Sequence, residues 1–305
     1  MRFISNEEVA AVMSMPLAIE AIEQAFRAMG EGGVAQQRRM RSERAGSKIS
    51  TMAAVMPGLG VSGAKVYSTV DGQFRFAVLL FSSTSGELLA CVQADELTRY
   101  RTAAASVVAA RRLADPASRV LGVFGTGVQA WAHVQAMVQA FAIEQVRVFG
   151  VSGMQAFAAR IGDELGVAAE AVDARRAAAA DIVVTATRAR TPILEGAWLR
   201  PGSFVAAIGS SQPTHREIDD RVLARAACVC VEWIEQARIE AGDLLLAPPE
   251  LALFDNALEL GQLVTGAAPY VRQPGDITIY KAVGIALEDV ALAARILGAE
   301  SLRLA

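Results

Sequence analysis

The hydrophobic pattern at the N-terminus predicts two helices. Ser5 and Glu8 have the spacing of a capping box, which marks the start of a first, short helix. A second helix is predicted from Pro16, because proline favours the first helical turn. Apolar residues then recur every three or four positions along one face until Gly30, which ends the helix.

The pattern changes between residues 38 and 94, where short apolar segments alternate with glycine-containing turns. Ser85-Gly86 lies between two such segments and predicts a hairpin. An alanine-rich helix is predicted next and ends before Asp115-Pro116. The predicted strands are Met52–Met56, Ala64–Val70, Ala77–Ser82 and Glu87–Gln93, and the helix is Glu96–Leu113.

Strands and helices alternate regularly in the rest of the chain, which predicts a doubly wound parallel sheet of the Rossmann type. We therefore expect an α/β protein with an α+β substrate and dimerisation domain over 1–116 and a dinucleotide-binding domain over 117–283. A closing helix over 282–297 would return to the first domain, to which we assign 284–305. The predicted strands are Val120–Phe124, Val146–Phe149, Asp181–Ala186, Phe204–Ile208 and Cys228–Glu232.

The composition of the chain argues against several classes of partner and site. Hydrophobic residues make up 53% of the chain and aromatic residues 6%, which indicates the aliphatic core of a helix-covered sheet. A net charge of -3 gives no electrostatic case for a nucleic acid or membrane partner. No signal peptide or membrane span is recognisable, and the three cysteines and two histidines lack the spacing of a metal site or disulfide framework. We expect a reduced, cytoplasmic protein without a metal.

The clearest motif follows the strand at 120–124. It reads Gly125-Thr126-Gly127-Val128-Gln129-Ala130 and opens a predicted helix. In a dinucleotide site the first glycine allows the tight turn and the second lets the backbone approach the pyrophosphate. The helix N-terminus then offers free amide donors to the phosphates. The strand before this motif and the helix after it predict a nicotinamide dinucleotide site.

The tip of the next strand bears on the choice between NAD and NADP. It reads Gly150-Val151-Ser152, where an NAD enzyme usually carries an acid that binds the ribose 2′-hydroxyl. No arginine follows directly to attract a 2′-phosphate. Both cofactors therefore stay open, with a lean towards NADP.

Lysine usage singles out one side chain. Only three of the 29 basic residues are lysines, and Lys65 lies in an apolar, strand-like segment. A partly buried lysine can have a lowered pKa suited to proton transfer, but it can also extend along apolar surface with its charge in water. The planar fork of Arg101 suits bidentate binding of a carboxylate, although an ion pair with Asp95 is an equally good interpretation. These residues alone leave both pairs of alternatives open.

Taken together, five segments of this chain resemble the ornithine cyclodeaminase/mu-crystallin family. The resemblance runs in order from the N-terminal helix to Asp289 and implies a homodimer with a substrate domain beside a Rossmann domain. The five segments are Gly63-Ala-Lys65, Arg101-Thr-Ala-Ala-Ala-Ser106, Gly125-Thr-Gly-Val-Gln-Ala130, Arg216-Glu-Ile-Asp219 and Lys281-Ala-Val-Gly-Ile-Ala-Leu-Glu-Asp289.

The resemblance implies a role for individual residues. Lys65 matches the family's active-site lysine, Arg101 its carboxylate-binding arginine, and Arg38 its second arginine, with Arg39 and Arg41 close by in sequence. The cofactor site implied in this way comprises Gly125, Thr126, Gly127, Val128, Gln129, Gly150, Ser152, Thr185, Thr187 and Thr102.

One segment departs from the family's cyclodeaminase pattern. Ornithine cyclodeaminases carry an acid after Gly-Gly or Gly-Ala, whereas this chain reads Ile208-Gly-Ser-Ser211-Gln-Pro213. Serine without an activating partner is no acid or base near neutral pH. Glu217 and Asp219 are the other carboxylates nearby, and a capping role is at least as good an interpretation of them.

We therefore expect an NAD(P)-dependent oxidoreductase that acts on a small imino or amino acid, as a ketimine reductase or amino-acid dehydrogenase. Cyclic ketimines such as pyrroline-2-carboxylate, or pyruvate with ammonia, are candidate substrates. Two alternatives stay open: ornithine cyclodeaminase itself, a lyase, and a non-catalytic nucleotide-binding protein of the crystallin kind.

Overall fold

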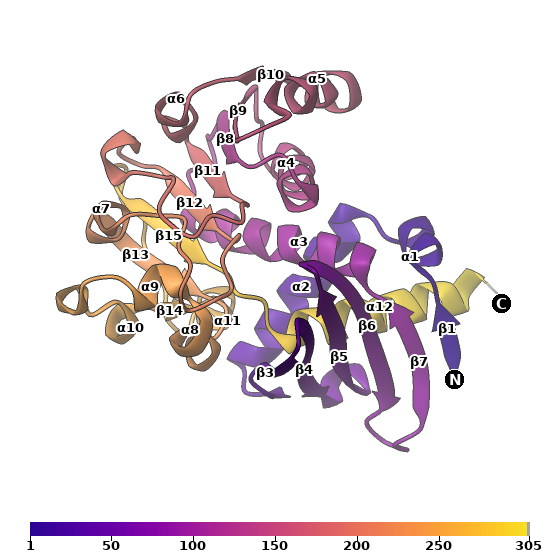
Figure 1. The fold of residues 1–305 in the computed structure, drawn as a ribbon. Helices are drawn as coiled ribbons and strands as arrows, with labels where there is room; N and C mark the ends of the chain where they lie inside the picture. Colours follow the sequence, from indigo (N-terminus) through magenta and orange to yellow (C-terminus); the bar gives the residue numbers. More distant parts are fainter. Residues whose placement is uncertain (304–305) are drawn as a thin grey trace. The chain divides into compact units, whose positions relative to one another are not determined.

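The computed structural model describes residues 1–303 and divides the chain into two compact units (Figure 1). One unit comprises residues 1–105 together with the segment from Gly284 onward, and the other comprises residues 106–283. The first boundary lies within helix α3 (Asp95–Leu113) rather than after it. The C-terminal helix belongs to the N-terminal unit.

The first unit is built on a seven-stranded mixed sheet with the strand order β1-β7-β6-β5-β4-β2, in which β3 also pairs with β4. Helices α1 (Asn6–Val12) and α2 (Met15–Gly30) precede the long strands, and α12 (Ala286–Arg303) follows the second unit in sequence. The strands are β1 (Arg2–Ile4), β2 (Ala35–Gln36), β3 (Met40–Arg44), β4 (Ser47–Met56), β5 (Val61–Val70), β6 (Gln73–Ser82) and β7 (Leu88–Gln93).

Alternation along these strands buries one face of the sheet. Met52, Lys65 and Val78 lie opposite one another on β4, β5 and β6, and all three are buried. Helix α12 packs against these three strands and against α2. Lys65 therefore projects from the covered face of the sheet, among apolar neighbours.

The predicted elements of this unit exist, with longer strands than the pattern indicated. Ser5 and Glu8 form the capping box of α1. Gly86 takes the left-handed conformation, with φ 73°, in the turn between β6 and β7. Strands β4 and β6 begin several residues before the predicted segments, because the ladder continues where polar residues alternate with Ile49 in β4 and with Phe74 and Phe76 in β6.

The second unit is built on an eight-stranded sheet in which every pairing is parallel, so the predicted fold class is confirmed. Its order is β10-β9-β8-β11-β12-β15-β13-β14. The strands are β8 (Val120–Phe124), β9 (Gln145–Phe149), β10 (Ala168–Ala171), β11 (Ile182–Thr185), β12 (Phe204–Ala207), β13 (Ala226–Val231), β14 (Leu258–Glu259) and β15 (Ile277–Lys281).

The connecting helices of the second unit pack on this sheet. Helix α4 contacts β8 and β11, while α5 contacts β9 and β10. The helices and helical turns are α4 (Val128–Ala140), α5 (Met154–Leu165), α6 (Ala174–Ala178), α7 (Asp220–Ala224), α8 (Ile234–Glu240), α9 (Gly242–Leu245), α10 (Leu253–Asn256) and α11 (Leu260–Thr265).

Three strands of this sheet, β10, β14 and β15, lie outside the predicted segments. The most consequential is β15, which is fully buried between β12 and β13. The following helix begins at Ala286 rather than at 282, because Gly284 takes a left-handed conformation, with φ 77°, that a helix does not continue through.

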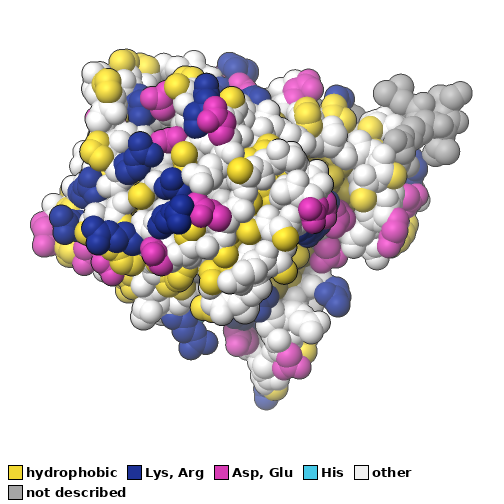
Figure 2. Space-filling model, turned by 90° about the horizontal axis from the view of Figure 1, so that it is seen from above, with side chains coloured by type: hydrophobic (Ala, Val, Ile, Leu, Met, Phe, Trp, Pro, Cys, Tyr) yellow, Lys and Arg dark blue, Asp and Glu magenta, His cyan; other side chains and the backbone are white. Residues whose placement is uncertain are grey.

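Positive and negative side chains are interspersed over the face drawn in Figure 2. Among the surface ion pairs of the chain are Arg176 with Glu170 at 2.7 Å and Arg200 with Asp181 at 3.2 Å. Within residues 1–303, no single helix has the length and hydrophobicity of a membrane span, although α1 and α2 pass that criterion as a bent pair.

Candidate functional site

The turn after β8 forms a cradle that a side chain would fill. Gly125 has φ 116°, and a Cβ atom there would lie 2.6 Å from the carbonyl oxygen of Ala186. A Cβ atom on Gly127 would meet nothing within 4 Å, so this glycine borders open space. Ala130 is fully buried, as expected for the small residue that packs the helix on the sheet.

Helix α4 begins directly at this cradle. Its N-cap is Gly127, no side chain caps its first turn, and Val128 is exposed. The free amides of the first turn and the positive end of the helix dipole therefore face the open space, which fits a dinucleotide pyrophosphate.

A buried histidine fixes the position of α4. His133 Nδ1 lies 2.7 Å from the carbonyl oxygen of Gln129 and its Nε2 lies 2.9 Å from Ser106 Oγ. Because a carbonyl only accepts, Nδ1 carries the proton and Nε2 accepts from the serine hydroxyl. Gln129 thus contributes its carbonyl to this anchor.

The ribose end of the cradle has the expected small residues. Thr126 donates its hydroxyl to the carbonyl of Ser152 over 3.1 Å and thereby joins the two strand tips. A Cβ atom on Gly150 would lie 3.3 Å from Thr126 Cγ2, so a larger residue there needs a small shift of Thr126. No carboxylate occupies this strand tip between Gly150 and Gly153.

Thr185 and Thr187 have a different role from the one expected. Both hydroxyls donate to the fully buried carboxylate of Glu217, at 2.8 and 2.7 Å. The same carboxylate accepts the amide of Thr187 at 2.7 Å and that of Gly209 at 2.8 Å. Thr185 is itself fully buried, so its side chain fixes the strand end instead of touching a cofactor.

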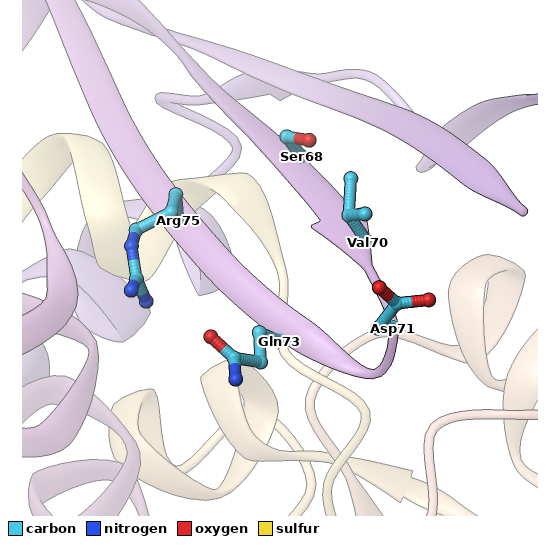
Figure 3. A pocket seen from close by; sticks show the side chains of 5 residues that line it. All are labelled: Ser68, Val70, Asp71, Gln73 and Arg75. Atoms are coloured by element: carbon cyan, nitrogen blue, oxygen red, sulfur yellow. The ribbon is translucent and has the colours of Figure 1, made fainter.

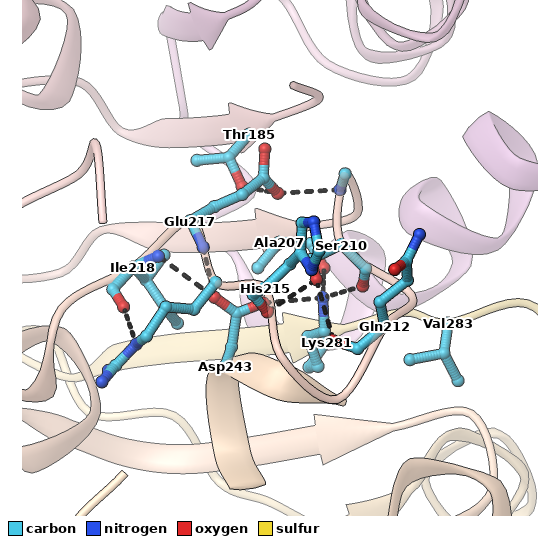
Figure 4. Close-up of polar contacts among 12 residues, drawn as sticks. Thr185, Ala207, Ser210, Gln212, His215, Glu217, Ile218, Asp243, Lys281 and Val283 are labelled. Atoms are coloured by element: carbon cyan, nitrogen blue, oxygen red, sulfur yellow. Dashed lines mark hydrogen bonds and ion pairs between the residues drawn. The ribbon is translucent and has the colours of Figure 1, made fainter. Parts of the chain in front are cut away.

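A buried lysine holds the neighbouring loop (Figure 4). Lys281, at the end of β15, donates to the carbonyl oxygens of Ser210 at 2.6 Å and Ala207 at 3.2 Å. Its ammonium also pairs with Asp243 Oδ2 at 2.8 Å, and neither side chain is exposed. Three oxygens therefore lie within 3.2 Å of this ammonium, and two of them are backbone carbonyls.

Asp243 and Glu217 complete this network. Asp243 Oδ1 accepts the amides of Glu217 at 2.6 Å and Ile218 at 3.1 Å. Burial raises the pKa of Glu217, whereas Lys281 and the threonine hydroxyls act in the opposite direction. Each Glu217 oxygen already accepts an amide and a hydroxyl, which leaves no oxygen to serve a substrate as acid or base.

Asp219 has the predicted capping role. Its carboxylate accepts the amide of Val222 at the start of α7 over 2.8 Å, and also the amide of Gly196 over 2.9 Å. Ser211 stands on the loop that Lys281 holds, and neither carboxylate nearby is free to replace the missing acid.

The first unit contains a second buried cluster around Lys65. Its ammonium donates to Thr98 Oγ1 and to Asp289 Oδ1, both at 2.7 Å, and lies 4.4 Å from the centre of the Phe76 ring. Lys65 is 1% exposed, so it does not reach water in the way a surface lysine does. Arg101 is buried too and pairs with Glu288 at 2.6 Å and, through Nε, with Asp289 at 3.5 Å.

The surroundings of Lys65 change its ionisation. Burial lowers its pKa from 10.5 to about 8; Asp289 acts against this decrease, and the positive charges of Arg101 and Arg39 add to it. An ammonium with this pKa exchanges its proton near neutral pH, as a proton donor in catalysis requires.

The second arginine of this cluster is Arg39 rather than Arg38. Arg39 donates to the carbonyl of Gly284 at 2.7 Å and lies close enough to Lys65 to affect its pKa. Arg38 is exposed, because neighbouring residues of an extended segment point in opposite directions. Thr102, expected at the cofactor, belongs to the first unit and donates to the carbonyl of Thr98 at 2.7 Å.

Three other kinds of candidate site offer few groups for binding or catalysis. The hollow drawn in Figure 3, about 270 Å³ at the β5–β6 turn, is lined by residues of that hairpin alone. Burial raises the pKa of the Cys228 thiol to about 11, so it is a weak nucleophile. Within the described residues, no three His, Cys, Asp or Glu side chains are grouped to hold a metal ion.

Comparison with known proteins settles the family. The model of the ornithine cyclodeaminase/mu-crystallin family matches residues 2–300. The chain belongs to this family. It is 32% identical over 308 residues to the ketimine reductase mu-crystallin of Mus musculus, with 95% of each chain covered.

Two solved structures support this membership. The probable ornithine cyclodeaminase of Bordetella pertussis Tohama I is 46% identical, with a TM-score of 0.97 and 99% and 98% of the two chains covered. An archaeal alanine dehydrogenase, a dimer with bound NAD, is 26% identical, with a TM-score of 0.95 and 100% and 97% covered.

Sequence reasoning missed Glu288, Asp289 and Asp243 as members of the two buried clusters. Glu288 and Asp289 close the segment that begins at Lys281, and this segment carried part of the family resemblance. Their position in the first turn of α12 was a further available signal, because helix N-termini favour acids. Asp243 also lies in the first turn of a helix, but that helix, α9, has only four residues and was not predicted.

Proposed function

We propose that the protein is an NAD(P)-dependent reductase of a small imino acid, able in the reverse direction to oxidise the amino acid. The observation that carries this proposal is the buried cluster of Lys65, Arg101 and Arg39 in a family member whose second unit has an intact dinucleotide cradle. The cluster contains these three cations and two carboxylates, Glu288 and Asp289, which pair with Lys65 and Arg101. This excess of positive charge suits the binding of a carboxylate.

Each member of the cluster has a distinct task. Arg101 and Arg39 bind and orient the substrate carboxylate, and Lys65 gives its proton to the imine nitrogen. When bound at Gly125–Gly127, the reduced nicotinamide supplies the hydride that the imine carbon receives. The amide donors of α4 would hold the pyrophosphate, and the Thr126–Ser152 hydrogen bond would keep the two strand tips in place beside it.

Ornithine cyclodeaminase is the second candidate, favoured by the similarity to the Bordetella pertussis protein. Ser211 argues against it, because ring closure with loss of ammonia needs a base where this serine stands. Glu217 does not substitute for it, since both of its oxygens are occupied by four donors.

One preparation tests both candidates. Oxidation of NADH and NADPH is measured with pyrroline-2-carboxylate and with pyruvate plus ammonia, and ammonia release is measured from ornithine with NAD. We expect imine-dependent cofactor oxidation, little ammonia from ornithine, and activity within a few-fold of the parent for Ser211→Ala. Robust proline formation from ornithine without imine reduction would replace the proposal with the lyase, and cofactor binding without either reaction would indicate a crystallin-like protein.

We also propose that the protein is a homodimer, paired through the open face of the first sheet. Strand register places five large apolar side chains, each between 43% and 58% exposed, on the face opposite to Lys65. These side chains are Phe3, Met40, Ile49, Val55 and Val70. Large apolar side chains exposed on one face of a sheet favour a partner there, and the dimer of the archaeal alanine dehydrogenase supports a second copy.

Light scattering after gel filtration tests this assembly. We expect Val55→Glu to shift the parent dimer towards monomer, because it places a charge in the apolar face. The matched control is Val151→Glu, at a fully exposed valine of the second unit, which should leave the dimer unchanged. A parent protein that elutes as a monomer would contradict the assembly while leaving the reductase proposal intact.

A further inference from the structure

The ammonium of Lys65 has two fixed acceptors that differ in charge. Thr98 donates its own hydroxyl to the carbonyl of Ala94 at 2.6 Å, and its oxygen accepts from Lys65 as a neutral partner. Asp289 is the charged partner, at the same distance of 2.7 Å. The remaining direction lies towards Phe76, whose ring face offers only a weak attraction.

The other charges near Lys65 do not hold its proton. Arg101 and Arg39 are cations and act against a third positive charge. Glu288, on the same helix turn as Asp289, has its Oε2 engaged by Arg101 at 2.6 Å. Asp289 Oδ2 has no hydrogen-bond partner among the described residues, so the charge of this carboxylate acts on Lys65 and, more distantly, on Arg101 Nε.

We infer that Asp289 is a positioning residue for the reaction: it keeps Lys65 protonated and fixed beside the two arginines, ready to transfer its proton. This inference rests on the proposed function for its meaning in catalysis. The effect of Asp289 on the protonation of Lys65 can be measured in the protein without substrate. Proton transfer moves one proton from Lys65 Nζ to the imine nitrogen, and Lys65 recovers it from water after the product leaves.

The small number of lysines makes a direct measurement practical. Selective labelling of lysine with ¹³C at Cε gives three resonances, for Lys48, Lys65 and Lys281, and Lys65→Arg and Lys48→Arg assign them. We expect Lys65 to titrate near pH 8 in the parent. Asp289→Asn keeps the shape and removes the charge, and should lower this midpoint by about one pH unit or more.

Two matched variants make the result specific. Glu288→Gln removes the neighbouring carboxylate and should move the Lys65 midpoint by less than Asp289→Asn does, whereas Asp289→Glu should keep it near that of the parent. An unchanged midpoint in folded Asp289→Asn would overturn the inference. If that variant does not fold, Thr98→Val decides, because a large fall of the midpoint after loss of the neutral partner would assign the control to Thr98.

The pH profile of imine reduction connects the measurement to catalysis. Below pH about 8 Lys65 carries its proton, and above it the proton is lost, so the parent rate should fall as pH rises through this value. Asp289→Asn should shift the fall to lower pH by the change seen in the titration. A shifted titration with an unshifted profile would refute the catalytic role, and a shifted titration in a protein that reduces no imine would refute the proposed function alone.

Discussion

The two units each bury a lysine–aspartate pair, and the pairs differ in what surrounds them. Lys281 and Asp243 lie 2.8 Å apart, and Lys65 and Asp289 lie 2.7 Å apart. Lys281 faces three oxygens, including two backbone carbonyls at strand ends. Lys65 faces two oxygens and an aromatic ring.

This difference distinguishes a structural lysine from a reactive one. In the second unit the Lys281 ammonium pairs with Asp243 and donates to two backbone carbonyls, while Asp243 accepts two backbone amides, so the network holds the loops around it. In the first unit cations outnumber carboxylates around Lys65, and Lys65 keeps one N–H direction without an oxygen. Equal burial therefore does not imply an equal role.

The largest effect is expected when the structural pair is broken. Lys281→Met leaves Asp243 buried without its cation and should lower the free energy of unfolding by about 3–5 kcal/mol. Lys48→Met is the control, because Lys48 is partly exposed and its pair with Glu43 should contribute less than about 1 kcal/mol. Urea unfolding of the three proteins measures both values, and equal losses would contradict a structural role for Lys281.

Breaking the Lys65–Asp289 pair should lower the activity of the protein more than its stability. Lys65→Met should lower imine reduction about 100-fold or more, because it removes a proton donor. Its stability should fall less than that of Lys281→Met, since Asp289 retains Arg101 Nε at 3.5 Å. Steady-state kinetics and urea unfolding on the same preparation test these two outcomes. A stability loss as large as that of Lys281→Met would show that Lys65 has a structural role like that of Lys281.

The second unit should bind its ligand through backbone rather than through the Lys281 network. Gly127→Val places a side chain in the open space at the start of α4 and should weaken cofactor binding at least about tenfold. Gly275→Val is the control, at an exposed glycine of the same unit that also borders open space. Cofactor fluorescence titration measures binding, and circular dichroism confirms folding; an unchanged Kd would remove Gly127 from the phosphate site.

A smaller effect should come from the glycine beside Arg101. A Cβ atom on Gly284 would lie 2.9 and 3.0 Å from the two terminal nitrogens of this guanidinium, so Gly284→Ala should displace it and raise KM for the imino acid about five- to tenfold. Gly266→Ala is matched in backbone strain, with the same φ of 77°, but borders open space. Both variants should lose about 1 kcal/mol of stability, and an equal KM in both would place the carboxylate elsewhere.

The sequence allowed the local features to be predicted, whereas the side-chain networks depended on the fold. The capping box of Ser5 and Glu8 and the Gly125–Gly127 turn involve residues close in sequence, whose geometry follows from their spacing. Lys65 and Arg101 stood out by residue type. Arg39 could not be separated from Arg38 without the direction of an extended segment.

The buried networks join residues that are far apart along the chain. Asp289 lies 224 positions from Lys65, and Asp243 accepts amides 25 and 26 positions away. Spacing alone therefore could not show which acid faces which lysine. Strand β15 was missed for a related reason: Thr278 and Lys281 interrupt its apolar pattern, and their buried polar atoms meet Leu113 and Asp243, which are distant along the chain.

The place of β15 also constrains the order in which the chain can fold during synthesis. In Figure 1 this yellow strand lies among the orange ones, between β12 and β13. Helix α12, which follows it directly, covers β4, β5 and β6 of the first sheet. A ribosome must therefore release the segment from Ile277 onward before the second sheet is complete and before α12 can cover the first sheet. The nascent chain carries two unfinished cores until this segment has left the ribosome, and chaperones that bind exposed apolar strands have that interval in which to act.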